Sequence, residues 1–515
     1  MSRGVRRAAA VALTGLQGTR VMVEAAVSHQ LPGMTIIGLP DAALAEAKQR
    51  VRTASAQVGL PISDRFVTVN LAPASLPKQG SAFDLAIALA VLSASEHVPT
   101  AKLAETAHIG ELGLDGSLRR PVGLLGAVIA ARELGFARVM VPLEAAAEAR
   151  LVPGIEVVAS DTLLDAIAWH RGEGPHADQD RAAARSPRPP APQPDSDADM
   201  SDVVGQEEAV EAMVVAAAGR HHVSLIGPPG SGKTLLATRL AGILPDLSPP
   251  ESLVASSIAS LSDVALDTLV TRPPFESPHH TASSAAVIGT GDARGIRPGS
   301  ISRASYGVLF MDEAPEFGRV ILDDLREPLE SGTVTISRAR IHASLPAKLQ
   351  LVLAANPCPC GNAGSPETAL SCTCTPHTRM RYLGRLSGPL TDRIDLRLTV
   401  RRVSSLAATS AGRSPTSADL RERVIAARAR ATARLRGTPW TLNGEVPGEW
   451  LRGESMRLPR SVTTAIDRAL ALGALTVRGY DRILRVAWSI SDLAGAARPG
   501  RSEVAQALAL RGGAT

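Results

Sequence analysis

The sequence predicts an α/β protein with an N-terminal α+β domain, a central domain built on a parallel sheet, and a helical C-terminal domain. Three observations predict this order. A stretch rich in Pro, Ala and Asp interrupts the chain at 172–200, a glycine-rich loop at 227–234 lies between an apolar strand and an apolar helix, and amphipathic helices follow from residue 406. With 515 residues, of which 45% are hydrophobic and 20% charged, the chain has the composition of a globular protein of about three domains.

The N-terminal domain, residues 1–171, mixes strands and helices. The segment "RFVTVNLAP" alternates as a strand does, "GSAFDLAIALAVLSAS" has the apolar density of a buried helix, and "GAVIAARELGFARVMVP" reads as a helix, a glycine stop and a strand. The start, "MSRGVRRAAAVALTGLQG", resembles a short signal peptide, but alternation resumes at once in "TRVMVEAAV", which favours a first strand. No apolar run approaches the roughly 20 residues of a membrane-spanning helix, so we expect a cytoplasmic protein with no membrane partner and reduced thiols.

Residues 172–200 have no apolar period and are predicted to form a disordered linker. The central domain, residues 201–405, contains three apolar runs, "VSLI", "GVLFM" and "LQLVLAA", of the kind that is buried on both faces of a parallel sheet. From 406 to 515 the pattern is helical. It begins with the Arg-rich "SADLRERVIAARARATARLRG", for which we expect a solvated charged face rather than a DNA grip.

The glycine-rich loop "GPPGSGKT" matches the pattern G-x-x-x-x-G-K-[ST]. Its glycines let backbone N–H groups surround phosphate oxygens at a helix N-terminus, its Lys reaches the terminal phosphates, and its Thr hydroxyl is placed to hold Mg²⁺. The pattern predicts an ATP and magnesium site. The residues concerned are Gly227, Pro228, Pro229, Gly230, Ser231, Gly232, Lys233 and Thr234.

Two acidic residues follow the apolar run "VLFM". Asp312 is predicted to hold Mg²⁺ through water, and Glu313 is predicted to orient and deprotonate the attacking water. The alternative is a strand that ends in acidic residues without any catalytic role. Because the phosphate-binding loop lies upstream, the pair indicates ATP hydrolysis and not only ATP binding.

The next apolar run ends at Asn356, where a polar side chain can sit between the water and the γ-phosphate. This order of strands and polar ends resembles the AAA+ ATPases, and Asn356 matches their first sensor. The resemblance implies that Arg393 in "GPLTDRIDL" is the arginine that reaches a neighbouring subunit's nucleotide, unless it pairs with an adjacent Asp. It also implies that Arg478 is the second-sensor arginine of the lid, with Arg482 as a weaker candidate.

Longer sequence segments indicate which AAA+ family the chain resembles. The phrases "TIIGLPDAALAEAKQRVRTA", "LPKQGSAFDLAIALA", "SPHHTAS", "GVLFMDEAPEF", "LREPLESGTVTISRA" and "NPCPCG" together resemble the magnesium chelatase-like AAA+ proteins of the ComM/YifB type. The resemblance covers nearly the whole chain except the linker. It implies a Lon-protease-like (ChlI-type) N-terminal domain, a central AAA+ P-loop domain and a helical lid. It also implies a homo-hexameric helicase that drives branch migration on single-stranded, forked or branched DNA, in homologous recombination or natural transformation.

The N-terminal resemblance excludes the peptidase chemistry of Lon. In the matching segment "PKQGSAFD", Ser81 falls one place early and Ala82 holds the position of the nucleophile. The position of the partner Lys falls in "GLLGAV", which contains no Lys, so the Ser–Lys dyad is missing. We expect this domain to be a platform or a DNA-engaging collar.

The segment "ESGTVTISRARIHASLPAKLQLVLAANP" is the most informative about the substrate. It resembles the pre-sensor hairpin of minichromosome maintenance helicases, and Arg338 falls on the cation that those helicases project into the central channel, with Arg340 as a possible assistant. One departure from the family is Glu276, where its members usually have Arg. His279 and His280 in "SPHHT" are candidates for phosphate or base contact, with packing or capping roles as the alternative.

Two other functions stay open. A magnesium chelatase-type ATPase would remodel a protein partner for metal insertion, and a protein unfoldase would project an aromatic residue from the hairpin, which has none. Aromatic residues make up only 3% of the chain, which argues against recognition of DNA by base stacking.

All four cysteines of the chain fall within residues 357–375: Cys358, Cys360, Cys372 and Cys374. The pattern C-x-C, eleven residues, C-x-C can supply four thiolates to a tetrahedral structural Zn²⁺. It is less diagnostic than paired C-x-x-C, so reduced thiols packed in a loop, an iron–sulfur cluster and redox disulfides remain alternatives. Four thiolates leave no open position for catalysis.

Overall fold

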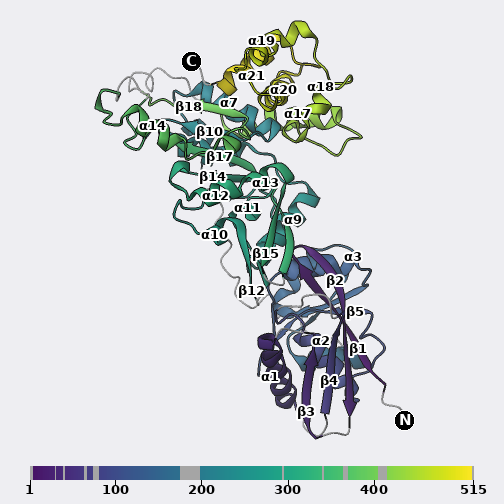
Figure 1. Cartoon of the computed structure of the whole chain (residues 1–515). Helices are drawn as coiled ribbons and strands as arrows, with labels where there is room; N and C mark the ends of the chain where they lie inside the picture. Colours follow the sequence, from purple (N-terminus) through teal and green to yellow (C-terminus); the bar gives the residue numbers. More distant parts are fainter. Residues whose placement is uncertain are drawn as a thin grey trace.

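The computed structural model describes residues 4–28, 31–38, 41–62, 66–73, 80–173, 198–292, 295–338, 341–363, 369–403 and 415–512. The chain runs from an N-terminal domain at one end, through a central domain, to a group of helices at the other end (Figure 1). This confirms the predicted fold class, an α/β protein that ends in a helical domain. Most of the predicted linker lies outside the described residues.

The N-terminal domain is built on a seven-stranded mixed sheet of order β3-β4-β2-β1-β5-β8-β9. Strand β2 runs antiparallel to β1 and β4, whereas β5, β8 and β9 extend the sheet in parallel from β1. The strands are β1 (Arg6–Thr14), β2 (Gln17–Ser28), β3 (Gly33–Ile37), β4 (Phe66–Ala72), β5 (Thr106–His108), β6 (Glu111–Leu112), β7 (Leu118–Arg119), β8 (Arg138–Pro142) and β9 (Glu156–Ser160). The helices are α1 (Asp41–Gln57), α2 (Asp84–Ala94), α3 (Leu124–Glu133), η1 (Leu143–Ala145), α4 (Ala146–Arg150) and α5 (Leu163–Arg171).

The predicted elements of this domain are found where the sequence placed them. The apolar segment predicted as a buried helix is α2, all of whose residues are buried. The residues that resembled a signal peptide form β1, whose central alanines and Val11 are buried in the sheet. The first-strand interpretation is therefore confirmed.

The central domain contains a five-stranded parallel sheet of order β11-β14-β17-β10-β18. Its strands are β11 (Phe275–Glu276), β14 (Val308–Met311), β17 (Gln350–Ala355), β10 (Val223–Ile226) and β18 (Leu396–Thr399). Two antiparallel hairpins are added, namely β12 (Gly289–Asp292) with β13 (Gly295–Pro298), and β15 (Thr333–Arg338) with β16 (Ile341–Pro346). The three predicted apolar strands are β10, β14 and β17, and they lie side by side with their carboxyl ends at one edge.

Helices surround this sheet. They are η2 (Met200–Asp202), α7 (Glu207–Gly219), α8 (Lys233–Ile243), α9 (Pro249–Leu261), α10 (Ser284–Ile288), α11 (Ser300–Arg303), η3 (Ala314–Glu316), α12 (Arg319–Asp324), α13 (Arg326–Ser331), η4 (Ala369–Ser371), α14 (Pro376–Leu383) and α15 (Gly388–Thr391). The C-terminal helices are α17 (Ser417–Arg434), η5 (Asn443–Glu445), α18 (Gly448–Arg452), α19 (Arg460–Ala471), α20 (Val477–Ala494) and α21 (Arg501–Gly512). Within the described ranges no helix is both long enough and apolar enough to cross a bilayer.

The Arg-rich helix α17 departs from the sequence interpretation. Arg423 and Arg430 are exposed as expected, but three other arginines of the helix bind protein groups. Arg421 and Arg428 donate to the carbonyls of Gly242 and Ala217, and Arg434 donates to the carboxylate of Asp492. Burial lowers the pKa of Arg428 to about 9. Arg421 and Arg428 join α17 to the central domain, because long guanidinium groups satisfy carbonyls at helix ends that packing has removed from water, whereas Arg434 joins α17 to α20.

The N-terminal domain packs against the central domain through α3 and α9. Arg120 donates to the carboxylate of Glu148 at 2.6 Å and to the carbonyl of Val264 at 2.9 Å. The turn between β1 and β2 approaches the second hairpin, since a Cβ placed on Gly15 would lie 2.8 Å from the carbonyl oxygen of Ser344 in β16. The N-terminal domain therefore lies next to the β15–β16 hairpin (Figure 1).

Candidate functional site

The phosphate-binding loop, residues 227–234, connects β10 to α8. Gly232 adopts a left-handed backbone with φ of 89° immediately before the helix, which a side chain would oppose. The N–H of Gly227 donates to the carbonyl of Ala355 at the end of β17, which holds the loop at the sheet edge. The loop therefore presents the N-terminus of α8 toward the carboxyl ends of the parallel strands, where anions bind.

Lys233 folds back onto the loop that precedes it. Its Nζ donates to the carbonyls of Gly227 at 2.7 Å and Pro228 at 3.0 Å, and to Oδ1 of Asn356 at 3.2 Å. Burial lowers the pKa of Lys233, and the nearby carboxylates of Asp312 and Glu313 oppose that shift. The predicted loop lysine and the predicted sensor thus contact each other directly.

The acidic pair lies beside them. Oγ1 of Thr234 donates to Oδ2 of Asp312 at 2.9 Å, so the two residues predicted to hold Mg²⁺ are in contact. Glu313 has a left-handed backbone with φ of 50°, and its N–H donates to Oδ1 of Asp312 at 2.9 Å. Hydroxyl and carboxylate oxygens are ligands that Mg²⁺ prefers, so this pair fits the ion.

These groups line one cavity of about 490 Å³, which is large enough for a nucleotide. The lining residues are Pro229, Gly230, Ser231, Gly232, Lys233, Thr234, Leu235, Asp312, Glu313 and Asn356. Six polar side chains, from the segments that follow three different strands, therefore meet at one place. The backbone N–H groups of the loop and the ammonium of Lys233 can surround a polyphosphate. The carboxylates of Asp312 and Glu313 line the same cavity.

The structure adds two residues that the sequence analysis did not assign to this site. Nδ1 of His280 lies 3.3 Å from Oε2 of Glu313. Nε2 of Gln206 donates to the carbonyl of Ser231 at 2.7 Å and supports the loop from outside. The two consecutive histidines marked His280 as a candidate in the sequence. Nothing in the sequence indicated that His280 would contact Glu313. The other histidine, His279, bonds the hydroxyl of Thr281 at 2.8 Å, whereas the N-cap of α10 is Ser283.

The two arginines expected to act on nucleotide are not among the residues lining this cavity. Arg393 is buried, donates to the carbonyl of Pro389 at 2.6 Å and forms an ion pair with Glu330. Arg478 is exposed and lies 3.9 Å from the same carboxylate oxygen of Glu330. Among the described residues, the acidic partner of both arginines is Glu330 and not a neighbouring Asp. The two arginines instead converge on one glutamate.

Arg482, the weaker candidate for the second sensor, is committed elsewhere. It donates to the buried carboxylate of Asp395 at 2.6 Å. Burial by itself disfavours the charged carboxylate, but Arg482 and the adjacent histidines lower the pKa of Asp395 below its usual range. Arg482 is therefore held in a structural ion pair with Asp395, which connects α20 to the sheet.

Glu276, the departure from the family pattern, is neutralised within the chain. Its two carboxylate oxygens accept from Nε and a terminal nitrogen of Arg303 at 3.0 and 2.9 Å. Arg303 also donates to the carbonyl of Pro298 in the first hairpin. The acidic side chain consequently fixes α11 to β11.

The predicted DNA contacts fall at the end of the β15–β16 hairpin. Arg338 is the last residue of β15 and pairs with Ile341 across the hairpin, and Arg340 lies outside the described residues. The body of the hairpin is anchored by Val334, Ile336 and Leu345, which are buried.

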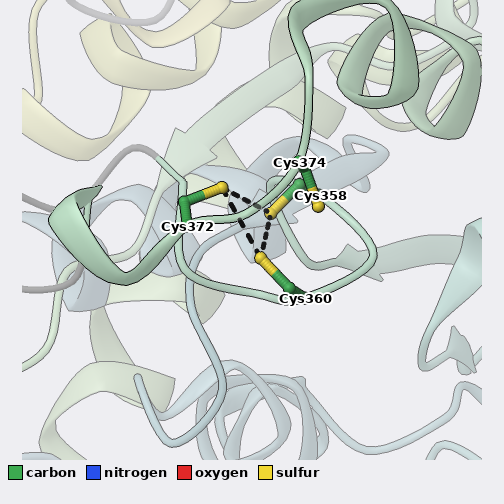
Figure 2. Close-up of side chains that lie close together, drawn as sticks. All are labelled: Cys358, Cys360, Cys372 and Cys374. Carbon is green, nitrogen blue, oxygen red and sulfur yellow. Dashed lines mark hydrogen bonds between the residues drawn. The ribbon is translucent and has the colours of Figure 1, made fainter.

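The four cysteines form one cluster (Figure 2). Their sulfur atoms all lie within 4.8 Å of one another, and Sγ of Cys358 lies 3.3 Å from that of Cys360 and 3.8 Å from that of Cys372. Four thiolates around Zn²⁺, at about 2.3 Å from the ion, would be about 3.8 Å apart, so the cluster fits that ion. A bond from the backbone of Asn362 and one from Cys358 lower the pKa of the Cys360 thiol to about 6, which favours a thiolate ligand.

The residues at the position of the Lon nucleophile make contacts of another kind. Ser81 donates its hydroxyl proton to the carboxylate of Glu111, and Ala82 follows it. Nearby, Asp84 is buried and paired with Arg50 at 2.6 Å, while burial raises the pKa of Asp84 to about 6. These groups form a structural polar cluster beside α2.

Comparison with known proteins gives three matching family models. "Subunit ChlI of Mg-chelatase" matches residues 23–145, "Magnesium chelatase, subunit ChlI" matches 199–408, and "Magnesium chelatase, subunit ChlI C-terminal" matches 414–511. The chain is 46% identical to an uncharacterized protein of Mycobacterium tuberculosis over 98% of both chains. It is 37% identical to the competence protein ComM of Haemophilus influenzae, over 96% of this chain and 95% of ComM. It is 38% identical to the uncharacterized protein YifB of Escherichia coli, over 94% and 92%.

Proposed function

The chain belongs to the magnesium chelatase-like AAA+ proteins of the ComM/YifB type, and from this premise we propose that it is an ATP-hydrolysing ring motor that acts on DNA. In the full form of the proposal it is a homo-hexameric helicase that drives branch migration in homologous recombination or natural transformation. It works in the cytoplasm. Its functional parts are residues 1–171, the linker 172–200, the ATPase core 201–405 and the lid 406–515.

The observation that carries the proposal is the continuity between the β15–β16 hairpin and the nucleotide cavity. The hairpin leads directly into β17, and the residue after β17 is Asn356, whose amide oxygen accepts from Lys233. A force on the hairpin is thereby transmitted along one strand to the sensor. With Arg338 at its end, the hairpin supplies one cation per subunit for contacts with DNA phosphates, which position a duplex or strand without reading its sequence.

The neighbouring elements fit the same role. A Cβ on Gly289 in β12 would lie 2.9 Å from Cδ1 of Ile336 in β15, so the two hairpins pack together. On the other side, the β1–β2 turn at Gly15 contacts β16 at Ser344. We assign the N-terminal domain the role of a collar that supports the hairpins.

Within the nucleotide site we assign the following roles. The backbone of residues 227–234 surrounds the phosphates, and Lys233 neutralises the terminal ones. Thr234 and Asp312 would hold Mg²⁺, which supplies charge for phosphoryl transfer when it is bound. Glu313 orients and deprotonates the attacking water, and Asn356 positions that water against the γ-phosphate.

We propose that Arg393 and Arg478 serve the nucleotide of a neighbouring subunit. Both are separated from the cavity of their own chain and meet at Glu330. A neighbour's nucleotide at this surface would compete with Glu330 for the two guanidinium groups. Positive charge delivered in this way stabilises the transition state of hydrolysis.

We also propose that Cys358, Cys360, Cys372 and Cys374 hold a structural Zn²⁺. The support is the mutual approach of four sulfur atoms from two parts of the chain, all within 4.8 Å of one another. A structural zinc site is closed, so the ion has no catalytic part.

The second candidate function is a magnesium chelatase-type ATPase that remodels a protein partner for metal insertion. It is favoured by the family models, all three of which are named after magnesium chelatase. The same nucleotide site would serve either motor, and the two differ in what they act upon.

The test is the ATP hydrolysis rate of the purified protein without DNA and with single-stranded, forked and four-way junction DNA. Stimulation that is greatest with forked or junction DNA supports the first proposal. An unchanged rate with every DNA form, combined with capture of a chelatase subunit from the same organism, would replace it with the second.

A further inference from the structure

The turn that carries Cys358 and Cys360 lies against the phosphate-binding loop at Gly361, and this contact has a functional consequence. Gly361, the residue after Cys360, has a φ of 78°, and a Cβ at this position would lie 2.5 Å from Cδ and 2.6 Å from Cγ of Pro229. The N–H of Gly361 donates to the carbonyl of Cys358 at 3.0 Å, which closes the turn that presents this surface. The backbone immediately after the second thiol therefore packs directly on Pro229, a residue of the nucleotide cavity.

Pro229 is held from a second direction. Nε of Arg402 donates to its carbonyl oxygen at 3.0 Å. The thiol turn at Gly361 and the guanidinium of Arg402 thus constrain the same residue of the phosphate-binding loop. Since that loop binds phosphate with its backbone N–H groups, its affinity depends on how far its conformation is fixed beforehand.

The cluster is also connected to the sensor and to the acidic pair. Cys358 is buried and lies two residues after Asn356. On the other side, a guanidinium nitrogen of Arg379 in α14 donates to Sγ of Cys372 at 3.2 Å. Just beyond α14, Arg385 donates to the carbonyl of Pro315 at 3.1 Å, in the turn that follows Glu313.

We propose that the thiol cluster is a metal-dependent brace of the nucleotide site, so that Zn²⁺ at the four sulfurs and ATP at the phosphate-binding loop strengthen each other's binding. The proposal rests on the zinc site proposed above. One tetrahedral ion ties together Cys358 after the sensor, the turn against Pro229 and the segment that leads through α14 to the acidic pair. When the ion leaves, the contact at Pro229 and the position of Asn356 are no longer fixed.

Linkage makes the effect reciprocal. If Zn²⁺ raises the affinity for ATP by a given factor, ATP must raise the affinity for Zn²⁺ by the same factor. We expect a factor of about ten, which corresponds to about 1.4 kcal/mol of coupling. Zinc affinity can be measured without hydrolysis, by competition with a chromogenic chelator in the presence and absence of a non-hydrolysable ATP analogue.

The experiment starts from the full-length protein with its zinc content measured. ATP affinity is then determined with a fluorescent ATP analogue in Mg²⁺, before and after removal of zinc. We expect about one zinc per chain and about tenfold weaker ATP binding without it. A chain purified without zinc that cannot be loaded with it would overturn the proposed zinc site. A zinc-loaded chain whose ATP affinity survives zinc removal would leave that site intact and overturn the coupling.

A variant that keeps all four thiols separates the contact from the ion. Gly361→Ala places a methyl group against Pro229, and we expect full zinc content with weakened ATP binding. Gly437→Ala is the matched control, because Gly437 has a φ of 86° and a Cβ there would meet nothing within 4 Å. Equal ATP affinity of the two variants would refute the route through Pro229.

Discussion

Nδ1 of His280 lies 3.3 Å from Oε2 of Glu313, so an imidazole from the loop before α10 contacts the carboxylate that we propose as the catalytic base. The histidine side chain is 31% exposed and that of the glutamate 50% exposed, so both can move when nucleotide or DNA binds. This loop continues through α10 into β12, one of the two hairpins. The pair therefore joins the hairpins to the hydrolytic carboxylate.

Replacement of His280 by Ala is expected to raise ATP hydrolysis in the absence of DNA. Without the imidazole, Glu313 is free to face the attacking water, so the requirement for DNA is relaxed. The measurement is the hydrolysis rate with and without forked DNA, and His377→Ala, at an exposed position, is the control. A lower DNA-free rate in His280→Ala would mean instead that the imidazole orients the carboxylate productively.

Glu313→Gln is expected to bind ATP normally and to hydrolyse it at least about 100-fold more slowly, because the amide cannot take the proton of water. Lys233→Ala is expected to lose ATP binding itself, since Lys233 supplies the one ammonium among the described residues that line the cavity. Equilibrium binding and hydrolysis are measured for both variants. Hydrolysis by Glu313→Gln at the rate of the unmodified protein would contradict the role of that carboxylate.

Arg393→Ala is expected to slow hydrolysis by about a thousandfold or more while ATP affinity in its own cavity changes little. If this arginine acts on a neighbour, mixing Arg393→Ala chains with Lys233→Ala chains will restore part of the hydrolysis, because mixed rings again contain sites that combine an intact cavity with an intact arginine from the next chain. Glu330→Gln, which frees both guanidinium groups, serves as a comparison. No recovery of hydrolysis in the mixed rings would indicate action within one chain.

Arg338→Ala is expected to lose stimulation by DNA and to keep basal hydrolysis. The salt dependence of DNA binding should also become shallower, because one phosphate contact per subunit is removed. Arg319→Ala removes an exposed arginine of α12 as a control for total charge. Equal loss of basal and stimulated hydrolysis in Arg338→Ala would point to a role in folding of the hairpin.

Stability is expected to fall as the pH drops below about 6.5. Burial lowers the pKa of His108 to about 4, of His170 to about 3 and of both His221 and His222 to about 4. Above pH 6.5 these histidines are neutral in the folded and unfolded chains. Between pH 6.5 and about 4 only the unfolded chain takes up the protons, so unfolding becomes more favourable.

The unfolding temperature measured across this pH range tests that expectation. His108→Gln should flatten the acid side of the profile, because one buried group no longer titrates. His377→Gln, at an exposed position, should leave the profile as it was. An unfolding temperature that stays constant from pH 7 to pH 4 would contradict the prediction.

The sequence by itself determined the fold class and identified the residues of the candidate nucleotide site. Each predicted group stands at the end of an apolar strand or in the loop that follows one. Because the carboxyl ends of parallel neighbouring strands meet at one edge, such groups come together whatever the rest of the chain does. Thr234 and Asp312 are in contact for this reason, as are Lys233 and Asn356.

The tertiary structure alone decided which groups meet across elements that are separate in sequence. Glu330 forms ion pairs with Arg393 and Arg478, Glu276 is paired with Arg303, and Arg421 and Arg428 of α17 donate to carbonyl oxygens of the central domain. The periodicity of the sequence does not indicate such pairs, because a charged residue occurs in the same pattern whether its side chain is solvated or paired. Its partner depends on how helices and sheet pack, and it is this packing that places His280 at Glu313 and the thiol turn at Pro229.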